Sequence, residues 1–156
     1  MNVAVLGSGG REHAICKKLE NSPKINSLFC IPGNAGTAKC ATNIQLDISN
    51  FNKLYKVILK NKIELIIVGP EQPLVDGIVD FFFDKNIKIF GPDKFSSLLE
   101  GSKHFTKKIC IENNIPTAKF GIFETFKDAN NFINKNKVPI VVKADGLASG
   151  KGVYIC

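Results

Sequence analysis

The sequence predicts an α/β fold, in which a Rossmann-like parallel sheet with flanking helices is followed by part of a second domain. Short apolar segments rich in valine and isoleucine alternate with longer segments whose apolar residues recur every three or four positions. The short segments are bounded by glycine, proline or asparagine. Since this rhythm of strand, helix and strand needs crossover connections, we expect parallel strands with helices packed on the sheet.

The expected strands are buried apolar segments that end at turn residues. They cover residues 2–6, 25–31, 63–69, 87–91, 118–123, 139–144 and 153–156. The expected helices have one apolar face. They cover residues 11–21, 51–62, 73–85, two successive segments within 92–116, and 126–136.

The alternation of strands and helices changes after Gly91, where two successive helices are predicted. We therefore expect a Rossmann-like domain at 1–92, a helical linker at 93–116 and an incomplete region at 117–156. A region of about forty residues is too short to bury a core of its own without metals or disulfides.

The composition is typical of a globular protein, with 44% hydrophobic and 22% charged residues in a chain of 156. No apolar run approaches the ~20 residues that span a bilayer. The five cysteines are widely spaced and predict neither a disulfide framework nor a zinc site. Scattered lysines account for the net charge of +7, which indicates a solvated surface and not a nucleic-acid site. We expect a cytoplasmic protein without membrane or nucleic-acid partners.

The first strand is followed by GSGGREH, residues 7–13. Its glycines let backbone amides approach a ligand, and the next helix adds its positive N-terminal end. A dinucleotide fingerprint would have a third glycine where Glu12 stands, and the second strand lacks the expected acidic residue, so NAD is not expected. We favour a phosphate or phosphosugar held by these amides and by Arg11, the single arginine. The alternative is a tight turn with a surface arginine.

Two more strands end in similar loops, PGNAGT at 32–37 and GPEQPLVDG at 69–77. The carboxyl ends of parallel strands lie at one edge of the sheet, which is where α/β folds bind ligands. Glu71 could accept a hydrogen bond from a ribose hydroxyl or an amine, or it could be an exposed turn carboxylate. We expect the three loops to form one ligand site.

The last segment, VVKADGLASGKGVYIC, is not a Walker A loop. Asp145 stands where that motif has its first glycine, and Gly152 where it has a serine or threonine. The segment also lies between two predicted strands. We favour a glycine-rich hairpin flap over nucleotide phosphates, with Lys143 on the strand beneath it, against a plain flexible hairpin.

Seven segments occur in the order and approximate spacing of one enzyme family. They are GSGGREHA, PGNAGT, IVGPEQPLVDG, KIFGP, LEGSKHFTK, IPTA and PIVVKADGLASGKGV. From residue 2 to residue 155 the chain therefore resembles the phosphoribosylamine–glycine ligases, or glycinamide ribonucleotide synthetases, which are the purine-pathway members of the ATP-grasp superfamily.

The resemblance implies a pre-ATP-grasp, substrate-binding domain up to about residue 92 and the start of an ATP-grasp domain from residue 117. It implies a ligase of de novo purine biosynthesis that joins glycine to 5-phosphoribosylamine with ATP and Mg²⁺, through a glycyl phosphate intermediate. Lysines, glycine amides and metal ions would supply the positive charge that such phosphoryl chemistry needs.

The resemblance also implies a role for individual residues. Those that would approach the phosphoribosylamine are Gly9, Gly10, Arg11, Glu12, Gly33, Asn34, Gly36, Gly69, Pro70, Glu71 and Asp76. Those that would bind ATP are Lys103, Lys143, Asp145, Gly146, Ser149, Gly150, Lys151 and Gly152. No metal ligand is assigned, because the family's Mg²⁺ ligands are expected in its C-terminal part.

Members of this family are much longer than 156 residues. We therefore expect this chain to be the N-terminal portion of such an enzyme and to be inactive alone. Two alternatives remain open: a non-catalytic Rossmann-type module that binds a phosphosugar, and another ATP-grasp ligase acting on a different carboxylate and amine. The sequence indicates neither an oligomeric state nor a reason for the end at Cys156.

Overall fold

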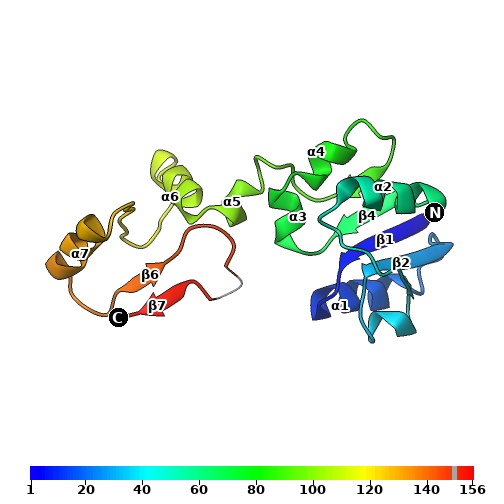
Figure 1. Ribbon diagram of the computed structural model, residues 1–156, viewed down its shortest axis with the longest axis horizontal. Helices are drawn as coiled ribbons and strands as arrows, with labels where there is room; N and C mark the ends of the chain where they lie inside the picture. The colour runs from blue at the N-terminus through cyan, green and yellow to red at the C-terminus, as the bar shows by residue number, and fades with distance from the viewer. Residues whose placement is uncertain (149–150) are drawn as a thin grey trace. The chain divides into compact units, whose positions relative to one another are not determined.

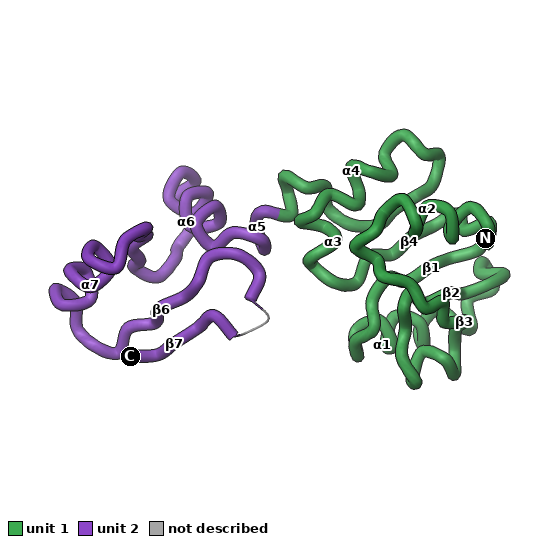
Figure 2. Tube along the Cα trace, viewed as in Figure 1, with its two compact units in different colours: residues 1–97 green, residues 98–156 purple. Residues whose placement is uncertain are grey.

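A computed structural model describes residues 1–148 and 151–156. The chain forms two compact units, residues 1–97 and residues 98–156 (Figure 2). Among the described residues, no helix combines the length and the apolar character needed to cross a bilayer.

The first unit is a five-stranded, all-parallel sheet with flanking helices (Figure 1). In the order of the sheet, its strands are β3 (Thr42–Asn43), β2 (Ser27–Pro32), β1 (Asn2–Gly7), β4 (Leu65–Val68) and β5 (Lys88–Phe90). Its helices are α1 (Gly10–Leu19), the 3-10 helix η1 (Thr37–Lys39), α2 (Phe51–Lys60), α3 (Glu71–Val75) and α4 (Ile78–Phe82). The predicted α/β fold is confirmed.

Helices cover both faces of the sheet, and neighbouring residues of its central strand point to opposite faces. On one face, Leu6 of β1 belongs to a buried cluster with Leu54 of α2 and Phe82 of α4. On the other face, Val5 belongs to a second cluster with Cys16 of α1. Figure 1 shows α1 on one side of the sheet and α2 and α4 on the other. Because all five strands are parallel, their C-terminal ends lie at the same edge of the sheet.

One predicted helix is two helices in the structure. The sequence predicts a single helix at 73–85, but α3 and α4 are separated at Gly77, whose φ of 92° lies in the left-handed region. An α-helix cannot continue through this conformation. Helix α3 also begins two residues before the predicted start, so Pro73 lies within its first turn.

The second unit contains three helices and a hairpin in its described part. Its helices are α5 (Leu98–Gly101), α6 (Lys103–Glu112) and α7 (Phe126–Lys135). The strands β6 (Val141–Lys143) and β7 (Val153–Ile155) pair antiparallel, as predicted for the two strands on either side of the glycine-rich segment.

The predicted strand at 118–123 is wrong, since these residues have no regular secondary structure. A strand needs a neighbour to satisfy its backbone hydrogen bonds. In the described part of the second unit, β6 and β7 pair with each other and do not extend the sheet to this segment.

The described part of the second unit has no closed core. None of the described residues from 98 to 156 falls in the buried class. Phe126 is 86% exposed and Ile155 is 77% exposed, whereas Phe82 in the first unit is fully buried. Its elements are therefore held by hydrogen bonds, such as that from the Lys103 amide to Asp145 Oδ1, and by small contacts such as the pair of Phe123 and Phe132 rings, whose centroids lie 5.1 Å apart.

Candidate functional site

Asn34 joins the first two of the predicted loops. Its Nδ2 donates hydrogen bonds to the Ser8 carbonyl at 2.8 Å and to the Gly9 carbonyl at 3.3 Å. Its Oδ1 accepts from the Gly36 amide at 2.7 Å and from the Thr37 amide at 3.0 Å. The amide group of Asn34 therefore fixes the loop after β2 against the loop after β1.

Arg11 joins the first loop to the third. Its Nη1 donates to Glu71 Oε1 at 2.8 Å, and its Nε donates to Glu12 Oε1 at 3.1 Å. Glu71 is the first residue of α3, directly after the loop that follows β4. The expectation that the three loops meet at one edge of the sheet is therefore confirmed by direct contacts between them.

Glu12 is a buried carboxylate beneath these loops. Its side chain is only 4% exposed, and its Oε2 accepts a hydrogen bond from the Gly9 amide at 2.6 Å. A Cβ atom at Gly7 or Gly69 would lie 2.7 Å from Glu12 Cδ, and one at Gly9 would lie 2.9 Å from Glu12 Oε2. These three glycines therefore make room for the Glu12 side chain, a function that the sequence-based interpretation did not include.

The ion pairs shift the pKa values of Arg11 and Glu71. Hydrogen bonds to Glu71 and then to Glu12 raise the pKa of the Arg11 guanidinium above its usual value. The hydrogen bond from Arg11 is the main cause that lowers the pKa of the Glu71 carboxyl. Arg11 and Glu71 are therefore both ionised at neutral pH.

His13 and Asn43 belong to this edge of the sheet, although neither was predicted as a site residue. A Cβ atom at Gly36 would lie 2.6 Å from His13 Nδ1, so the imidazole packs directly on the second loop. Asn43 Nδ2 donates to the Asn34 carbonyl at 2.7 Å, and its Oδ1 accepts from Thr37 Oγ1 at 2.7 Å. His13 adjoins GSGGRE and could have been found there, whereas Asn43 lies in a two-residue strand without a sequence signal.

Four other predicted substrate residues make none of the side-chain contacts described above between the loops. Gly33 has a φ of 75° and Pro70 precedes the first residue of α3. The Cβ position of Gly10, the first residue of α1, has no heavy atom within 4 Å. Asp76 lies at the C-terminal end of α3, where it accepts a hydrogen bond from Gln72 Nε2 at 2.9 Å.

In the second unit, two of the predicted ATP-binding segments contact each other. Asp145 Oδ1 accepts from the Lys103 amide at 2.7 Å and from the His104 amide at 3.3 Å, and Asp145 Oδ2 accepts from the Ser102 hydroxyl at 3.0 Å. Lys103 Nζ donates to the Gly146 carbonyl at 2.7 Å. The segments GSK and ADG thus form one hydrogen-bonded cluster at the N-terminus of α6.

Asp145 has a lowered pKa in this cluster. Desolvation raises the pKa of its carboxyl, but hydrogen bonds from the His104 amide, the Ser102 hydroxyl and the Gly146 and Lys103 amides outweigh it. The ionised carboxylate is therefore the stable form at the positive end of the helix.

The other predicted ATP-binding residues lie in or beside the hairpin. Lys143 is the last residue of β6, and both it and Lys151 are exposed. The Gly152 carbonyl accepts a hydrogen bond from the Ala144 amide at 2.8 Å, next to the paired strands. Ser149 and Gly150 lie outside the described residues. Within the described part of the chain, no group of three or more His, Cys, Asp or Glu side chains could hold a metal ion.

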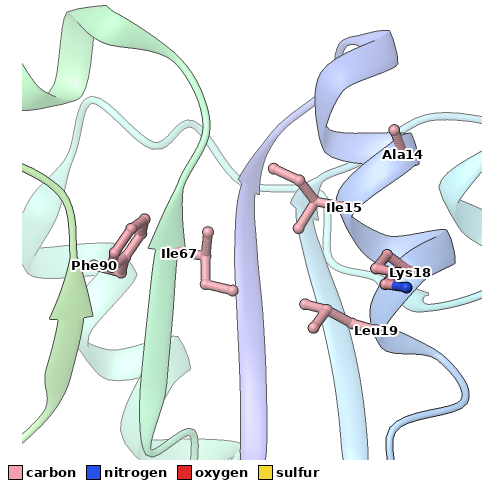
Figure 3. Close-up of a pocket in the computed structure, with 6 residues that line it drawn as sticks. All are labelled: Ala14, Ile15, Lys18, Leu19, Ile67 and Phe90. Atoms are coloured by element: carbon pink, nitrogen blue, oxygen red, sulfur yellow. The ribbon is translucent and has the colours of Figure 1, made fainter.

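An apolar groove lies on the first unit beside α1 (Figure 3). Its lining residues come from α1, β4 and β5; they are Ala14, Ile15, Lys18, Leu19, Ile67 and Phe90. The predicted substrate residues are all described by the structure, and none of them lines this groove. The groove is therefore separate from the candidate site at the loops.

Family models match both parts of the chain. The model of the N domain of phosphoribosylglycinamide synthetase matches residues 1–100, and the model of the ATP-grasp (A) domain of the same enzyme matches residues 101–156. The chain belongs to the phosphoribosylglycinamide synthetase family. The two matches run through the chain in the order N domain and then ATP-grasp domain.

Curated members of the phosphoribosylglycinamide synthetase family are similar over the full length of this chain. The phosphoribosylamine–glycine ligase of Caldanaerobacter subterraneus subsp. tengcongensis is 47% identical over 155 residues, which cover 99% of this chain and 37% of the relative. That of Pseudomonas aeruginosa is 46% identical over 158 residues, covering 99% of this chain and 36% of the relative. The chain thus spans little more than a third of the length of these family members.

Solved structures show the same fold. The phosphoribosylamine–glycine ligase of Thermotoga maritima has a TM-score of 0.78 and 36% identity, covering 99% of this chain and 36% of that one. The biotin carboxylase domain of 2-oxoglutarate carboxylase from Hydrogenobacter thermophilus has a TM-score of 0.76 at 19% identity, over 99% of this chain and 37% of that one. The second likeness shows a fold that the phosphoribosylglycinamide synthetase family shares with other enzymes.

Proposed function

We propose that this chain is the N-terminal part of an ATP-dependent ligase that joins glycine to 5-phosphoribosylamine in purine biosynthesis. The meeting of the three loops carries this proposal, since Asn34 and Arg11 tie all of them together at one edge of the sheet. The enzyme of Caldanaerobacter, 47% identical to this chain, is a phosphoribosylamine–glycine ligase. We propose that phosphoribosylamine binds at this edge, close to the eleven residues that the resemblance assigns to it.

The proposed reaction has two steps. An oxygen of the glycine carboxylate attacks the γ-phosphorus of ATP, the bond to the bridging oxygen breaks, and ADP leaves with the electron pair. The product is glycyl phosphate. The amine of phosphoribosylamine then attacks the glycyl carbonyl carbon, phosphate leaves, and the amine loses a proton as the amide forms.

The second unit is proposed to bind the ATP phosphates. The cluster of Lys103, Asp145 and Gly146 supports this assignment because it brings together two segments that resemble nucleotide-binding motifs. The hairpin residues proposed to contact the phosphates include Lys143, Lys151 and Gly152. Because the described part of the chain offers no acidic cluster for Mg²⁺, we propose no Mg²⁺ ligand within it.

We also propose that this chain does not make the amide product alone. The described residues of the second unit bury no side chain, and phosphoryl transfer requires groups held rigidly around the phosphates. The test supplies ATP, glycine and freshly generated phosphoribosylamine to the purified chain. We expect no glycinamide ribonucleotide above background, and its formation would overturn this part of the proposal.

Substrate binding is tested separately from catalysis. Isothermal titration of ribose 5-phosphate, which has a hydroxyl in place of the amine, should show binding to the chain without ATP. If neither ribose 5-phosphate nor phosphoribosylamine binds, the assignment of the loops to this substrate is wrong.

A further inference from the structure

Arg11 is surrounded by carboxylate oxygens at the edge of the sheet. Its Nε faces Glu12 Oε1, its Nη1 faces Glu71 Oε1 at 2.8 Å, and its Nη2 lies 3.5 Å from Glu71 Oε2. All three nitrogens of the guanidinium thus donate to carboxylates of this chain. These contacts use three of the five N–H donors of Arg11, so a substrate phosphate would find one N–H on each Nη and would share the guanidinium with both carboxylates.

The charge around Arg11 disfavours a phosphate at this position. One guanidinium faces two carboxylates, so a phosphate beside it would also lie close to negative charge. Like charges at short range repel, and the repulsion increases where water is partly excluded. A carboxylate without a proton can only accept hydrogen bonds, and therefore suits a ligand group with N–H or O–H donors.

The three side chains run from the interior to the surface. Glu12 is 4% exposed, Arg11 is 53% exposed and Glu71 is 43% exposed. Glu12 is fixed in turn by the Gly9 amide. Arg11 therefore connects a buried, hydrogen-bonded carboxylate to an exposed one on the third loop, and it restrains the direction in which the Glu71 oxygens point.

We propose that Arg11 is a positioning residue, which holds the Glu71 carboxylate so that it accepts a hydrogen bond from the amine at C1 of phosphoribosylamine. The sugar then lies with C1 toward Glu71, and its phosphate is bound elsewhere than on Arg11. This inference rests on the proposed function, and it deepens it by assigning an orientation to the substrate.

Binding of two ligands can show whether Arg11 positions Glu71 or binds the substrate phosphate directly. Ribose 5-phosphate carries a hydrogen-bond donor at C1, whereas 1,4-anhydroribitol 5-phosphate carries the same phosphate and no group at C1. Their dissociation constants are measured by calorimetry for the 156-residue chain and for Arg11→Ala, Glu71→Gln and the double variant. Lys17→Ala is the matched control, because it breaks another exposed ion pair of α1, that with Glu20.

We expect Arg11→Ala and Glu71→Gln each to weaken binding of ribose 5-phosphate by roughly tenfold, because the first releases the Glu71 carboxylate from its orientation and the second replaces a charge-assisted hydrogen bond by a neutral one. The double variant should bind ribose 5-phosphate no more weakly than the single variant with the lower affinity, since both changes act on the same interaction. The anhydroribitol phosphate has no group at C1 that could contact Glu71. Its dissociation constant should therefore change by less than about twofold in each variant, which is the accuracy to which independent effects add. Arg11→Lys should not restore binding, because an ammonium lacks the planar fork of donors that fixes the direction of the Glu71 carboxylate.

A direct phosphate contact would give the opposite pattern. Arg11→Ala would then weaken both ligands equally, Arg11→Lys would recover part of the affinity, and Glu71→Gln would leave ribose 5-phosphate binding unchanged or tighter. This result would overturn the inference and leave the proposed function standing. If the unmodified chain bound neither ligand, the proposed function would fail and the inference with it.

Discussion

Gly69 lies directly against the buried side chain of Glu12. A Cβ atom at this glycine would lie 2.7 Å from Glu12 Cδ and Cγ, a separation that real Cβ atoms essentially never show. Glu12 cannot move away without loss, because its carboxylate accepts the Gly9 amide and the Arg11 Nε. The third loop is thus packed on the first helix through a contact that only glycine permits.

Gly69→Ala should therefore destabilise the first unit. We expect the free energy of unfolding to fall by about 1–3 kcal/mol, the usual effect of adding a methyl group to a packed site. Urea denaturation followed by circular dichroism measures the change. Gly10→Ala is the matched control, since its Cβ would meet nothing within 4 Å, and alanine in the first turn of α1 should leave stability equal or slightly higher. Equal stability of the two variants would contradict the packing described for Glu12.

Asn34→Asp should loosen the contact between the first two loops. An aspartate keeps acceptors for the Gly36 and Thr37 amides but loses the donor to the Ser8 and Gly9 carbonyls. It also places a carboxylate against two carbonyl oxygens. We expect a loss of about 1–3 kcal/mol in unfolding free energy at neutral pH, the penalty for unpaired or repelling polar groups.

The comparison with Asn34→Ala separates the two contributions to this loss. Alanine removes both the donor and the acceptors, so it should also expose the Gly36 and Thr37 amides to hydrogen exchange. Aspartate should leave these two amides protected. Equal exchange in both variants would show that the amide oxygen of Asn34 is not what holds the second loop.

Asp145 should make the start of α6 sensitive to acid. Its pKa in the folded chain lies below the ordinary value of 3.8, so its stabilisation is fully present above that value and is lost as the pH falls through the lower folded pKa. At pH 6, Asp145→Asn should reduce the protection of the Lys103 and His104 amides by about 1 kcal/mol, as for other helix caps.

Hydrogen exchange measured by NMR between pH 6 and pH 2.5 tests this prediction. The difference between the unmodified chain and Asp145→Asn should shrink below about pH 4, the ordinary range of an aspartate. Asn50→Ala, which removes the side chain that caps the Lys53 amide at the start of α2, should reduce protection there by an amount that does not vary with pH. A constant difference for Asp145→Asn as well would exclude a titrating cap.

The strands and their loops could be predicted because their signals are local. Asn2–Gly7 and Leu65–Val68 are continuous apolar runs that end at glycine, and each is paired on both sides in the sheet. The segment 118–123 has apolar residues at every second position, Ala118, Phe120 and Ile122, which is another pattern typical of strands, yet it forms no strand. Local pattern alone does not supply a neighbouring strand, so the prediction was wrong there.

The side-chain contacts of the candidate site were harder to predict from the sequence. The glycines around Arg11 were interpreted as openings for a ligand, but the space beside Gly7, Gly9 and Gly69 is filled by Glu12. A glutamate in the first turn of a helix normally indicates an exposed residue near the positive end of the helix. Its burial depends on the third loop, which is distant in sequence, and no local pattern could reveal it. The roles of the residues in binding substrate stay predictions.

The absence of buried side chains between residues 98 and 156, among those described, has a consequence for handling the protein. Segments with few buried contacts open with little free energy, and opened segments are where proteases cut. Brief digestion with trypsin should therefore remove the second unit at its lysines and leave a resistant fragment that ends close to Ser97, with the edge formed by Arg11, Asn34 and Glu71 intact and suitable for ligand titration by itself.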